Sequence, residues 1–234
     1  MSDAPEQLLL RVLSPGEQAF DNFCGRGNAE ARARLQSLAG ADAAPGVRLW
    51  LAGAAGSGKS HLLRAALREA QHAGRAARLE FAACFATEQG RVADDEPARD
   101  LWLIDDVDAI AGDGRAEAAL MQLWNESSGG LVFASRMHPD ACAWQLPDLR
   151  SRLLASEIFR LVPPDDDDLR ALIAARAAAV GLMLDDEVVA YLLRRLPRDP
   201  RSLSQAVDQL DLASWRQRRR VTLPLVRDVL GIGR

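Results

Sequence analysis

The sequence predicts a parallel α/β sheet with helices on both faces, followed by a small all-helical domain. Three observations support this prediction. Short apolar segments alternate with helix-forming stretches through most of the chain, which is typical of a sheet buried on both faces. A glycine-rich phosphate loop joins the first of these segments to a helix. After Pro163-Pro164 the apolar residues recur only at helical spacing.

The apolar segments mark five expected strands. They occupy residues 48–52, 77–82, 101–104, 131–135 and 157–161. Ahead of the first strand we expect a helix over 29–38, with Asn28 as its N-cap. Because strands and helices alternate, the strands should lie parallel in one sheet.

The C-terminal part predicts a bundle of helices, each with one apolar face. The three faces comprise Leu169, Leu172, Ile173, Ala177 and Val180; Val188, Val189, Leu192, Leu193 and Leu196; and Leu203, Ala206, Val207, Leu210 and Ala213. Thr222 should cap a last short helix that ends at Leu230. The acidic run 165–168 stands at a helix start, where capping explains it better than a functional acidic patch.

Composition excludes several classes of protein. The net charge of −4 gives no basic field, so avid sequence-independent DNA binding is not expected. No apolar run approaches the roughly 20 residues of a membrane span, and no signal-peptide layout is present. The cysteines are widely spaced and do not cluster with histidines, so we expect reduced thiols in a cytoplasmic protein without a resident metal of its own. These residues are Cys24, Cys84, Cys142, His61, His72 and His138.

The segment 53–60 reads G-x-x-x-x-G-K-S, the pattern of a phosphate loop, between an apolar strand and a helix. Lys59 is the single lysine in a chain that otherwise uses arginine. In such a loop, backbone amides cradle phosphates, the lysine reaches the β and γ oxygens, and Ser60 ligates Mg²⁺. The alternative, a flexible connection with an incidental lysine, does not explain the flanking strand and helix. The nucleotide-binding candidates are Gly53, Gly56, Ser57, Gly58, Lys59, Ser60 and His61.

Two further strands end in polar side chains. Asp105 and Asp106 follow the strand 101–104, at the edge of an open sheet where ligands bind. Asp105 is the candidate Mg²⁺ ligand and Asp106 the candidate for orienting a water; the alternative is a pair of exposed loop aspartates. Ser135 ends the strand 131–135, either as a sensor of phosphate or as a local cap.

Two arginines stand where they could meet phosphates. Arg152 lies near the end of an expected helix, where a guanidinium can stabilise charge on a neighbouring subunit's nucleotide. Arg201 begins a helix after Pro200 and could bend back to a nucleotide in its own chain. For both, ordinary surface charge is the competing interpretation. The basic run 216–220 is best interpreted as the solvated end of a helix.

Together, the order of these motifs resembles that of AAA+ ATPases, and within them the DnaA replication-initiator group. The resembling segments are 20–23 (FDNF), 58–62 (GKSHL), 147–153 (PDLRSRL) and 221–226 (VTLPLV), and the resemblance covers about residues 18–232. It includes no helix-turn-helix, so we expect no appended DNA-binding domain. The chain is most similar to the stand-alone regulatory inactivators of the initiator. At 134–137 the run Ala-Ser-Arg-Met departs from the initiators' Thr-Ser-Asp-Arg.

The N-terminal segment 7–12 (QLLLRV) resembles the peptide by which replication proteins dock on the sliding clamp. In that motif Gln7 fixes the orientation while Leu8 and Leu10 fill an apolar cleft. Arg11 and Val12 replace the Pro-Leu that often ends the motif. The alternative is a segment that packs on its own domain.

The resemblance implies a leader at 1–17, an AAA+ nucleotide-binding domain at 18–163 and a helical lid at 164–234. ADP or ATP with Mg²⁺ would bind through the loop and Asp105, with Arg201 contributing from the lid. Docked on the DNA polymerase III β clamp, and so reaching DNA only indirectly, the protein would present Arg152 to ATP on DnaA. Hydrolysis of that ATP would prevent re-initiation, while its own ATPase would be weak.

Two other functions stay open at this point. A helicase-loader-like or other replication-associated AAA+ ATPase would need vigorous hydrolysis and a DNA-contacting element. A small-molecule kinase on a phosphate-loop fold would need an acceptor-binding insertion in place of the helical segment. The sequence does not decide between ATP and ADP, nor the number of subunits.

Overall fold

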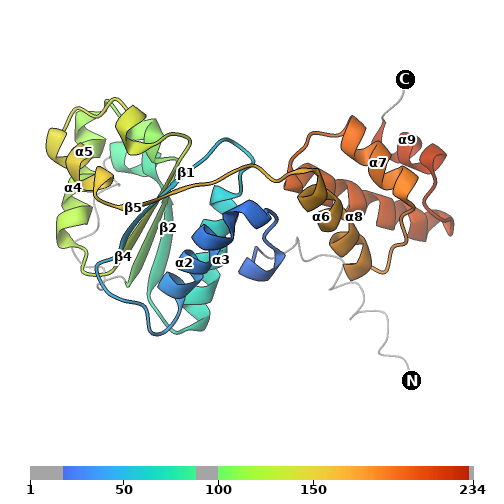
Figure 1. Ribbon diagram of the computed structural model, residues 1–234, viewed down its shortest axis with the longest axis horizontal. Coiled ribbons are helices and arrows are strands. Elements are labelled where there is room, and N and C mark those ends of the chain that lie inside the picture. Colours follow the sequence, from blue (N-terminus) through green and yellow to red (C-terminus); the bar gives the residue numbers. More distant parts are fainter. Residues whose placement is uncertain (1–17, 88–99, 232–234) are drawn as a thin grey trace. The chain divides into compact units, whose positions relative to one another are not determined.

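The computed structural model describes residues 18–87 and 100–231, which form two compact units (Figure 1). Of the described residues, the first unit contains 18–23, 30–52, 59–87 and 100–159. The second contains 24–29, 53–58 and 160–231. The expected clamp-docking residues lie outside the described residues. These are Gln7, Leu8 and Leu10.

The first unit is built on a five-stranded sheet in the order β2-β3-β4-β1-β5. Its strands are β1 (Arg48–Ala52), β2 (Ala77–Phe81), β3 (Leu101–Asp105), β4 (Gly130–Ser135) and β5 (Glu157–Arg160). The pairings of β2 with β3, β3 with β4, and β1 with β4 are parallel. Every residue of β3 and β4 is buried, which explains why these strands are mainly apolar, with the polar residues Asp105 and Ser135 only at their ends. The predicted parallel α/β fold is therefore confirmed.

Helices cover both faces of this sheet (Figure 1). They are α2 (Ala29–Ala39), α3 (Lys59–His72), α4 (Gly114–Glu126) and α5 (Pro147–Leu154). Alternate strand residues such as Trp50, Ile104 and Phe133 pack with α4 and α5 in one core cluster. Their neighbours along the strands, such as Leu51 and Val132, are buried toward the other face.

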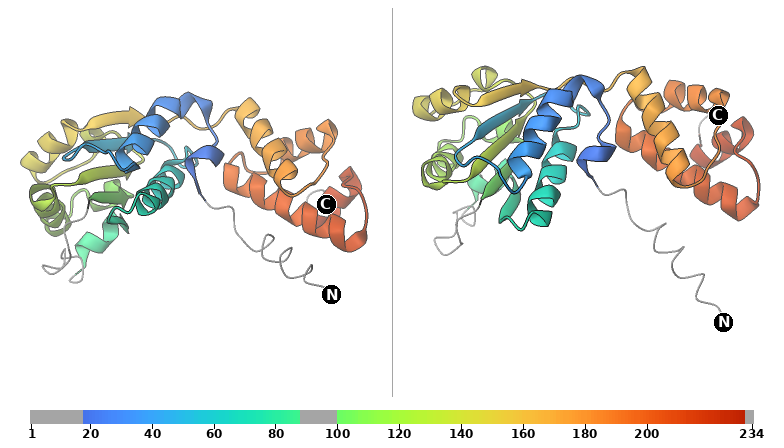
Figure 2. Two further views of the ribbon diagram at one scale, coloured as in Figure 1. Left: turned by 90° about the horizontal axis from the view of Figure 1, so that it is seen from below. Right: turned by 60° about the horizontal axis from the view of Figure 1, so that its bottom comes forward.

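Among the described residues, four helices make up most of the second unit, as the sequence predicts (Figure 2). They are α6 (Asp166–Ala179), α7 (Asp186–Arg195), α8 (Pro200–Gln217) and α9 (Leu223–Leu230). Most of the three predicted apolar faces lie in their common core. Thr222 occupies the N-cap position of α9 but makes no side-chain capping bond. No helix among the described residues is long and apolar enough to cross a membrane.

The expectation that Asn28 caps the following helix is wrong. Its side chain instead pairs with the main chain of Val162, which donates to Oδ1 and accepts from Nδ2, both at 2.8 Å. Asn28 is buried, and this pairing satisfies both ends of its amide. The residue therefore ties the segment before α2 to the segment before α6.

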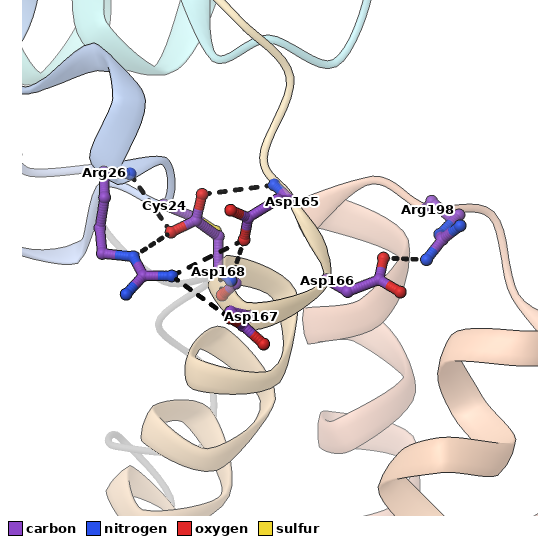
Figure 3. A network of polar contacts seen from close by, with 7 residues as sticks. All are labelled: Cys24, Arg26, Asp165, Asp166, Asp167, Asp168 and Arg198. Atoms are coloured by element: carbon purple, nitrogen blue, oxygen red, sulfur yellow. Dashed lines mark hydrogen bonds and ion pairs between the residues drawn. The ribbon is translucent and has the colours of Figure 1, made fainter.

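The acidic run at the start of α6 forms a helix cap and an ion-pair cluster (Figure 3). Asp165 Oδ1 accepts from Asp168 N at 2.7 Å, and Asp168 Oδ2 accepts from Asp165 N, completing a capping box. The other Asp168 oxygen accepts from Arg26 Nε at 2.9 Å. Asp166 pairs separately with Arg198. Of the two interpretations of this run, helix capping and a functional acidic patch, the structure supports capping.

Candidate nucleotide-binding site

The loop after β1 has a backbone that only glycine adopts easily. Gly56 and Gly58 have φ values of +79° and +97°, in the region that side chains with a Cβ avoid. Gly53 is needed for space, because a Cβ there would lie 2.6 Å from Ser57 Oγ and 2.9 Å from the Leu161 carbonyl oxygen. The three glycines of the predicted loop therefore allow a tight turn in which main-chain groups lie close together.

Ser57 gives this turn an unsatisfied polar atom. Its side chain is fully buried, and its Oγ has no hydrogen-bond partner among the described residues. A buried hydroxyl without a partner costs about 1–3 kcal/mol, so such atoms mark places where a polar ligand can bind. A phosphate oxygen would meet this requirement, and the loop thus fits a nucleotide.

Lys59 is the first residue of α3 and is buried, with 7% of its surface exposed. Burial lowers the pKa of its ammonium, whereas the charges of Asp105, Asp106 and Asp108 act in the opposite direction. The first turn of α3 contains no acidic residue. An ammonium at a helix N-terminus without a nearby acidic cap suits a phosphate, because the helix dipole favours the same anion.

Ser60 and Asp105, the two candidate Mg²⁺ ligands, lie together. Ser60 Oγ donates to Asp105 Oδ2 at 2.6 Å, and Asp105, at the end of β3, is 3% exposed. A hydroxyl and a carboxylate are oxygen ligands of the kind that Mg²⁺ uses when phosphates complete its shell. The described residues contain no group of three or more acidic, histidine or cysteine ligands.

Asp106 follows with an exposed side chain and a left-handed backbone, at φ +54°. Such a conformation costs an L-residue with a Cβ on the order of 1 kcal/mol, although aspartate tolerates it better than most. The turn points the chain away from β3 and leaves the Asp106 carboxylate free of the core. This placement is compatible with orienting a water, the role that the sequence suggests.

Asp108 is a site residue that the sequence analysis missed. Its carboxylate accepts from Arg136 N at 3.1 Å and from Arg136 Nε at 3.0 Å, and its side chain is 3% exposed. Burial alone would raise its pKa, but the hydrogen bonds from Arg136 outweigh burial and hold the pKa below its usual value. The ion pair therefore joins the turn after β3 to the tip of β4.

Ser135, the candidate sensor, is fully buried at the end of β4. Its Oγ accepts from Met137 N at 3.0 Å, and its hydroxyl helps to lower the pKa of Asp108. These bonds are those of a local cap, the alternative that the sequence leaves open. The next residue, Arg136, directs its guanidinium to Asp108.

Arg152 lies in the last turn of α5, half-buried, and its Nη1 donates to Asn125 Oδ1 on α4 at 2.7 Å. The start of α5 is also held by α4. Glu117, fully buried, accepts from Gln145 N at 2.9 Å and Leu146 N at 2.8 Å, just before the helix begins. The sequence analysis missed Glu117 and Asn125, because neither belongs to a local motif.

The two remaining nucleotide-binding candidates are His61 and Arg201. His61 Nε2 lies 2.9 Å from the Ala19 carbonyl oxygen, and burial lowers the pKa of the imidazole. Arg201 is exposed in the first turn of α8. Asp199, which caps α8, lies 3.9 Å from where a Cβ of Gly56 would be. Within the second unit, the start of α8 thus adjoins the phosphate loop.

Comparisons with known proteins agree with this architecture. Residues 165–230 match the family model described as "Hda, lid domain". Domain III of the Thermotoga maritima replication initiation protein DnaA superposes with a TM-score of 0.75 at 21% identity, covering 92% of this chain and 96% of that one.

Two further structures show the same fold. AMPPCP-bound DnaA from Aquifex aeolicus gives a TM-score of 0.67 at 22% identity, over 83% of this chain and 65% of that one. The Thermotoga maritima Holliday junction branch migration motor RuvB gives 0.70 at 17% identity, over 92% and 71%.

The sheet, the phosphate loop and the C-terminal helices thus form a fold of the AAA+ type with a helical lid. Residues 165–230 match the Hda lid-domain model, and the whole fold is similar to that of DnaA domain III.

Proposed function

We propose that this protein is a nucleotide-dependent regulator that switches off the replication initiator. Bound to the DNA-loaded sliding clamp through its leader, it would present Arg152 to the ATP on DnaA and stimulate its hydrolysis. Replication would then not start again in the same round. The proposal divides the chain into the leader (1–17), the AAA+ domain (18–163) and the lid (164–234).

The nucleotide part of the proposal is supported by the phosphate loop. The loop segment 57–60 contains an unsatisfied Ser57 hydroxyl, a buried Lys59 and Ser60, and Ser60 bonds to Asp105 at the end of β3. Two of the similar DnaA structures carry the ATP analogue AMPPCP. We infer that ADP or ATP binds here, with Gly53–Gly58 amides and Lys59 on the phosphates and Arg201 adding charge from the lid.

Mg²⁺ would bind with the nucleotide, next to Ser60 and Asp105. When bound, it would neutralise phosphate charge and fix the orientation of the phosphate oxygens. The chain's own residues would bind and enclose the phosphates. Asp106, exposed at the end of β3, would orient a water only weakly, so we expect slow intrinsic hydrolysis.

The regulatory part depends on Arg152. A guanidinium supplied in trans can accelerate phosphoryl transfer on a partner by about 10³–10⁵-fold. Arg152 suits this role, because it lies at the end of a short helix, is partly exposed, and within the described ranges its guanidinium forms a hydrogen bond only to a neutral amide. Arg150, by contrast, is engaged with the carboxylate of Asp140. The Arg152 environment is the single observation that favours a regulator acting on a partner.

The first experiment tests nucleotide binding. Calorimetry with ADP and with ATP, each with Mg²⁺, should give binding that Lys59→Ala weakens by at least about 30-fold, as expected when a buried charge partner is removed. Arg64→Ala, on the outer surface of α3, serves as the control. Equal affinities in the wild type and Lys59→Ala would refute the nucleotide site.

The second experiment tests the regulatory activity. Purified protein with clamp-loaded DNA should accelerate hydrolysis of DnaA-bound ATP, and Arg152→Ala should abolish the acceleration. Arg150→Ala removes an equal charge from the same helix and should preserve it. Clamp-coated beads should retain the wild type and Glu6→Ala but not Gln7→Ala. No acceleration by the wild type, or full acceleration by Arg152→Ala, would exclude this function.

A further inference from the structure

The end of α8 exposes a tryptophan that the fold does not use. Trp215 leaves 77% of its surface accessible, whereas Trp50 and Trp102 are buried in the first unit. Leu212, three residues earlier and therefore on the same side of the helix, is 39% exposed. An indole offers a large apolar surface that normally finds a partner. Packing inside the helical unit gives no reason for an indole here.

Arginines follow this tryptophan closely in the sequence. Four of the five residues 216–220 are arginine, and all four are exposed. None of the four has an ion-pair partner within 18–87 and 100–231, although arginines elsewhere, such as Arg26 and Arg176, pair with carboxylates. A single cation in the last turn is enough to interact favourably with the helix dipole, and Arg216 provides that cation. The other three arginines lie beyond the end of α8.

The turn after α8 holds these groups in one place. Arg218 has a left-handed backbone with φ +52°, which reverses the chain. Arg219 N donates to Ser214 O at 3.2 Å, and Ser214 Oγ donates to Arg219 O at 2.6 Å. The main chain of Arg219 therefore lies against the residue next to Trp215. Indole and guanidinium groups share one end of the helix in a hydrogen-bonded turn.

We propose that this surface, Trp215 with Arg216, Arg218, Arg219 and Arg220, binds single-stranded nucleic acid. The indole would stack on an unpaired base, and the guanidinium groups would contact the adjacent phosphates, which is the usual chemistry of single-strand binding. An acidic peptide would satisfy the arginines but would leave the flat face of Trp215 without a matching partner. A duplex would present phosphates but keep its bases stacked away from the indole.

The net charge of −4 limits the strength of this contact. The protein as a whole does not attract a polyanion, so the surface acts locally, on a strand that is already close. This inference goes beyond the proposed regulatory function, in which DNA is reached only through the clamp. It does not depend on nucleotide binding or on Arg152.

Intrinsic fluorescence reports the stacking directly, because Trp215 is far more exposed than Trp50 or Trp102. Adding oligo-dT of about 12 nucleotides to the full chain should quench a red-shifted emission component, and Trp215→Phe should lack that component. In anisotropy titrations with the labelled strand, Trp215→Ala should bind at least about fivefold more weakly. Trp215→Phe keeps an aromatic face and should bind within about twofold of wild type.

The salt dependence tests the arginines. Each neutralised phosphate of a single strand contributes about −0.7 to the slope of log affinity against log salt. Arg219→Ala/Arg220→Ala should therefore flatten the slope by about 1.4. Arg170→Ala/Arg194→Ala removes equal charge from exposed positions on α6 and α7 and should leave the slope unchanged. Circular dichroism melting curves of all variants verify that they are folded.

Three outcomes would overturn the proposal. The first is no quenching by oligo-dT at low salt, or equal binding by the wild type and Trp215→Ala in folded protein. The second is duplex of the same length binding as tightly as the single strand. The third is tighter binding of polyglutamate or of anionic phosphatidylserine vesicles than of oligo-dT, which would assign the surface to an acidic protein or a membrane instead.

Discussion

Asn125 on α4 accepts a hydrogen bond from the guanidinium of Arg152 on α5, with 2.7 Å between Oδ1 and Nη1. The same α4 holds the beginning of α5 through Glu117, which accepts from the main chain of Gln145 and Leu146. One helix therefore positions both ends of the short helix that presents the proposed trans-acting arginine. The placement of Arg152 depends on α4 as much as on α5.

Asn125→Ala should reduce stimulated hydrolysis of DnaA-bound ATP by about three- to tenfold, the effect of losing one hydrogen bond worth roughly 1 kcal/mol. Clamp retention should be unchanged. Asn125→Asp keeps an acceptor oxygen and should restore most of the stimulation, a rescue that a purely structural defect would not show. Gln122→Ala, on the exposed side of α4, is the control. Wild-type stimulation by Asn125→Ala would show that Arg152 does not need this contact.

Glu117→Ala should destabilise the first unit by about 3 kcal/mol or more. The substitution removes the buried carboxylate that accepts from the amides of Gly112, Gln145 and Leu146, and each lost hydrogen bond contributes about 1 kcal/mol. Urea unfolding followed by fluorescence measures the loss. Glu126→Ala, at the exposed end of the same helix, should change stability by less than about 0.5 kcal/mol. Similar values for the two variants would contradict the buried role assigned to Glu117.

Asp168→Ala should destabilise the second unit by about 1–2 kcal/mol. It removes half of the capping box and the partner of Arg26, at a position that is only 7% exposed. Asp167 offers a matched control, because its carboxylate lies 3.9 Å from Arg26 and its side chain is 79% exposed. Exposed pairs of that kind contribute little. Thermal unfolding should separate Asp168→Ala clearly from Asp167→Ala.

The thiol of Cys24 should make the stability of the second unit depend on pH. Burial, followed by the charges of Asp168 and Asp165, raises the pKa of its thiol to about 11. Between the ordinary value of 9.0 and about 11, the unfolded chain loses this proton while the folded chain keeps it. Folded protein then binds more protons than unfolded protein, so stability falls as the pH rises through that window.

Alkylation rates test the Cys24 prediction. Because the thiolate is the reactive form, iodoacetamide should modify Cys24 slowly at neutral pH and increasingly fast up to about pH 11. Asp168→Asn should accelerate the reaction only partly, since burial is the larger cause. Peptide mass spectrometry follows the site, with Cys84, which is exposed, as the internal reference. Rapid modification of Cys24 at neutral pH would refute the raised pKa.

Much of the fold could be predicted from the sequence, because its strands are continuous apolar runs. The expected 77–82 strand ends one residue early, since Ala82 begins a 3₁₀ helix. Asp105 belongs to β3, which the apolar pattern alone ended at 104. An apolar pattern marks only apolar side chains. It therefore misses strand residues such as Asp105, which are polar although they are buried.

Long-range polar contacts account for what the sequence could not reveal. Asn28 looked like a helix cap because its local context is that of one, but its partner Val162 is 134 residues away. Glu117 and Asp108 each bind groups 28 residues distant, so no short motif contains the pair. The phosphate loop was recognisable because its glycines satisfy a local backbone requirement. The geometry around Arg152 and Ser135 needed the folded chain.

The left-handed backbone at Asp106 matters for anyone who engineers this chain. Glycine or asparagine would occupy that conformation with less strain, so a screen for heat resistance alone should favour them at 106. Such a screen would remove an exposed carboxylate beside the phosphate loop without any sign of damage to the fold. Heat-resistant variants should therefore be checked for a substitution at position 106 before their nucleotide turnover is compared with that of the parent.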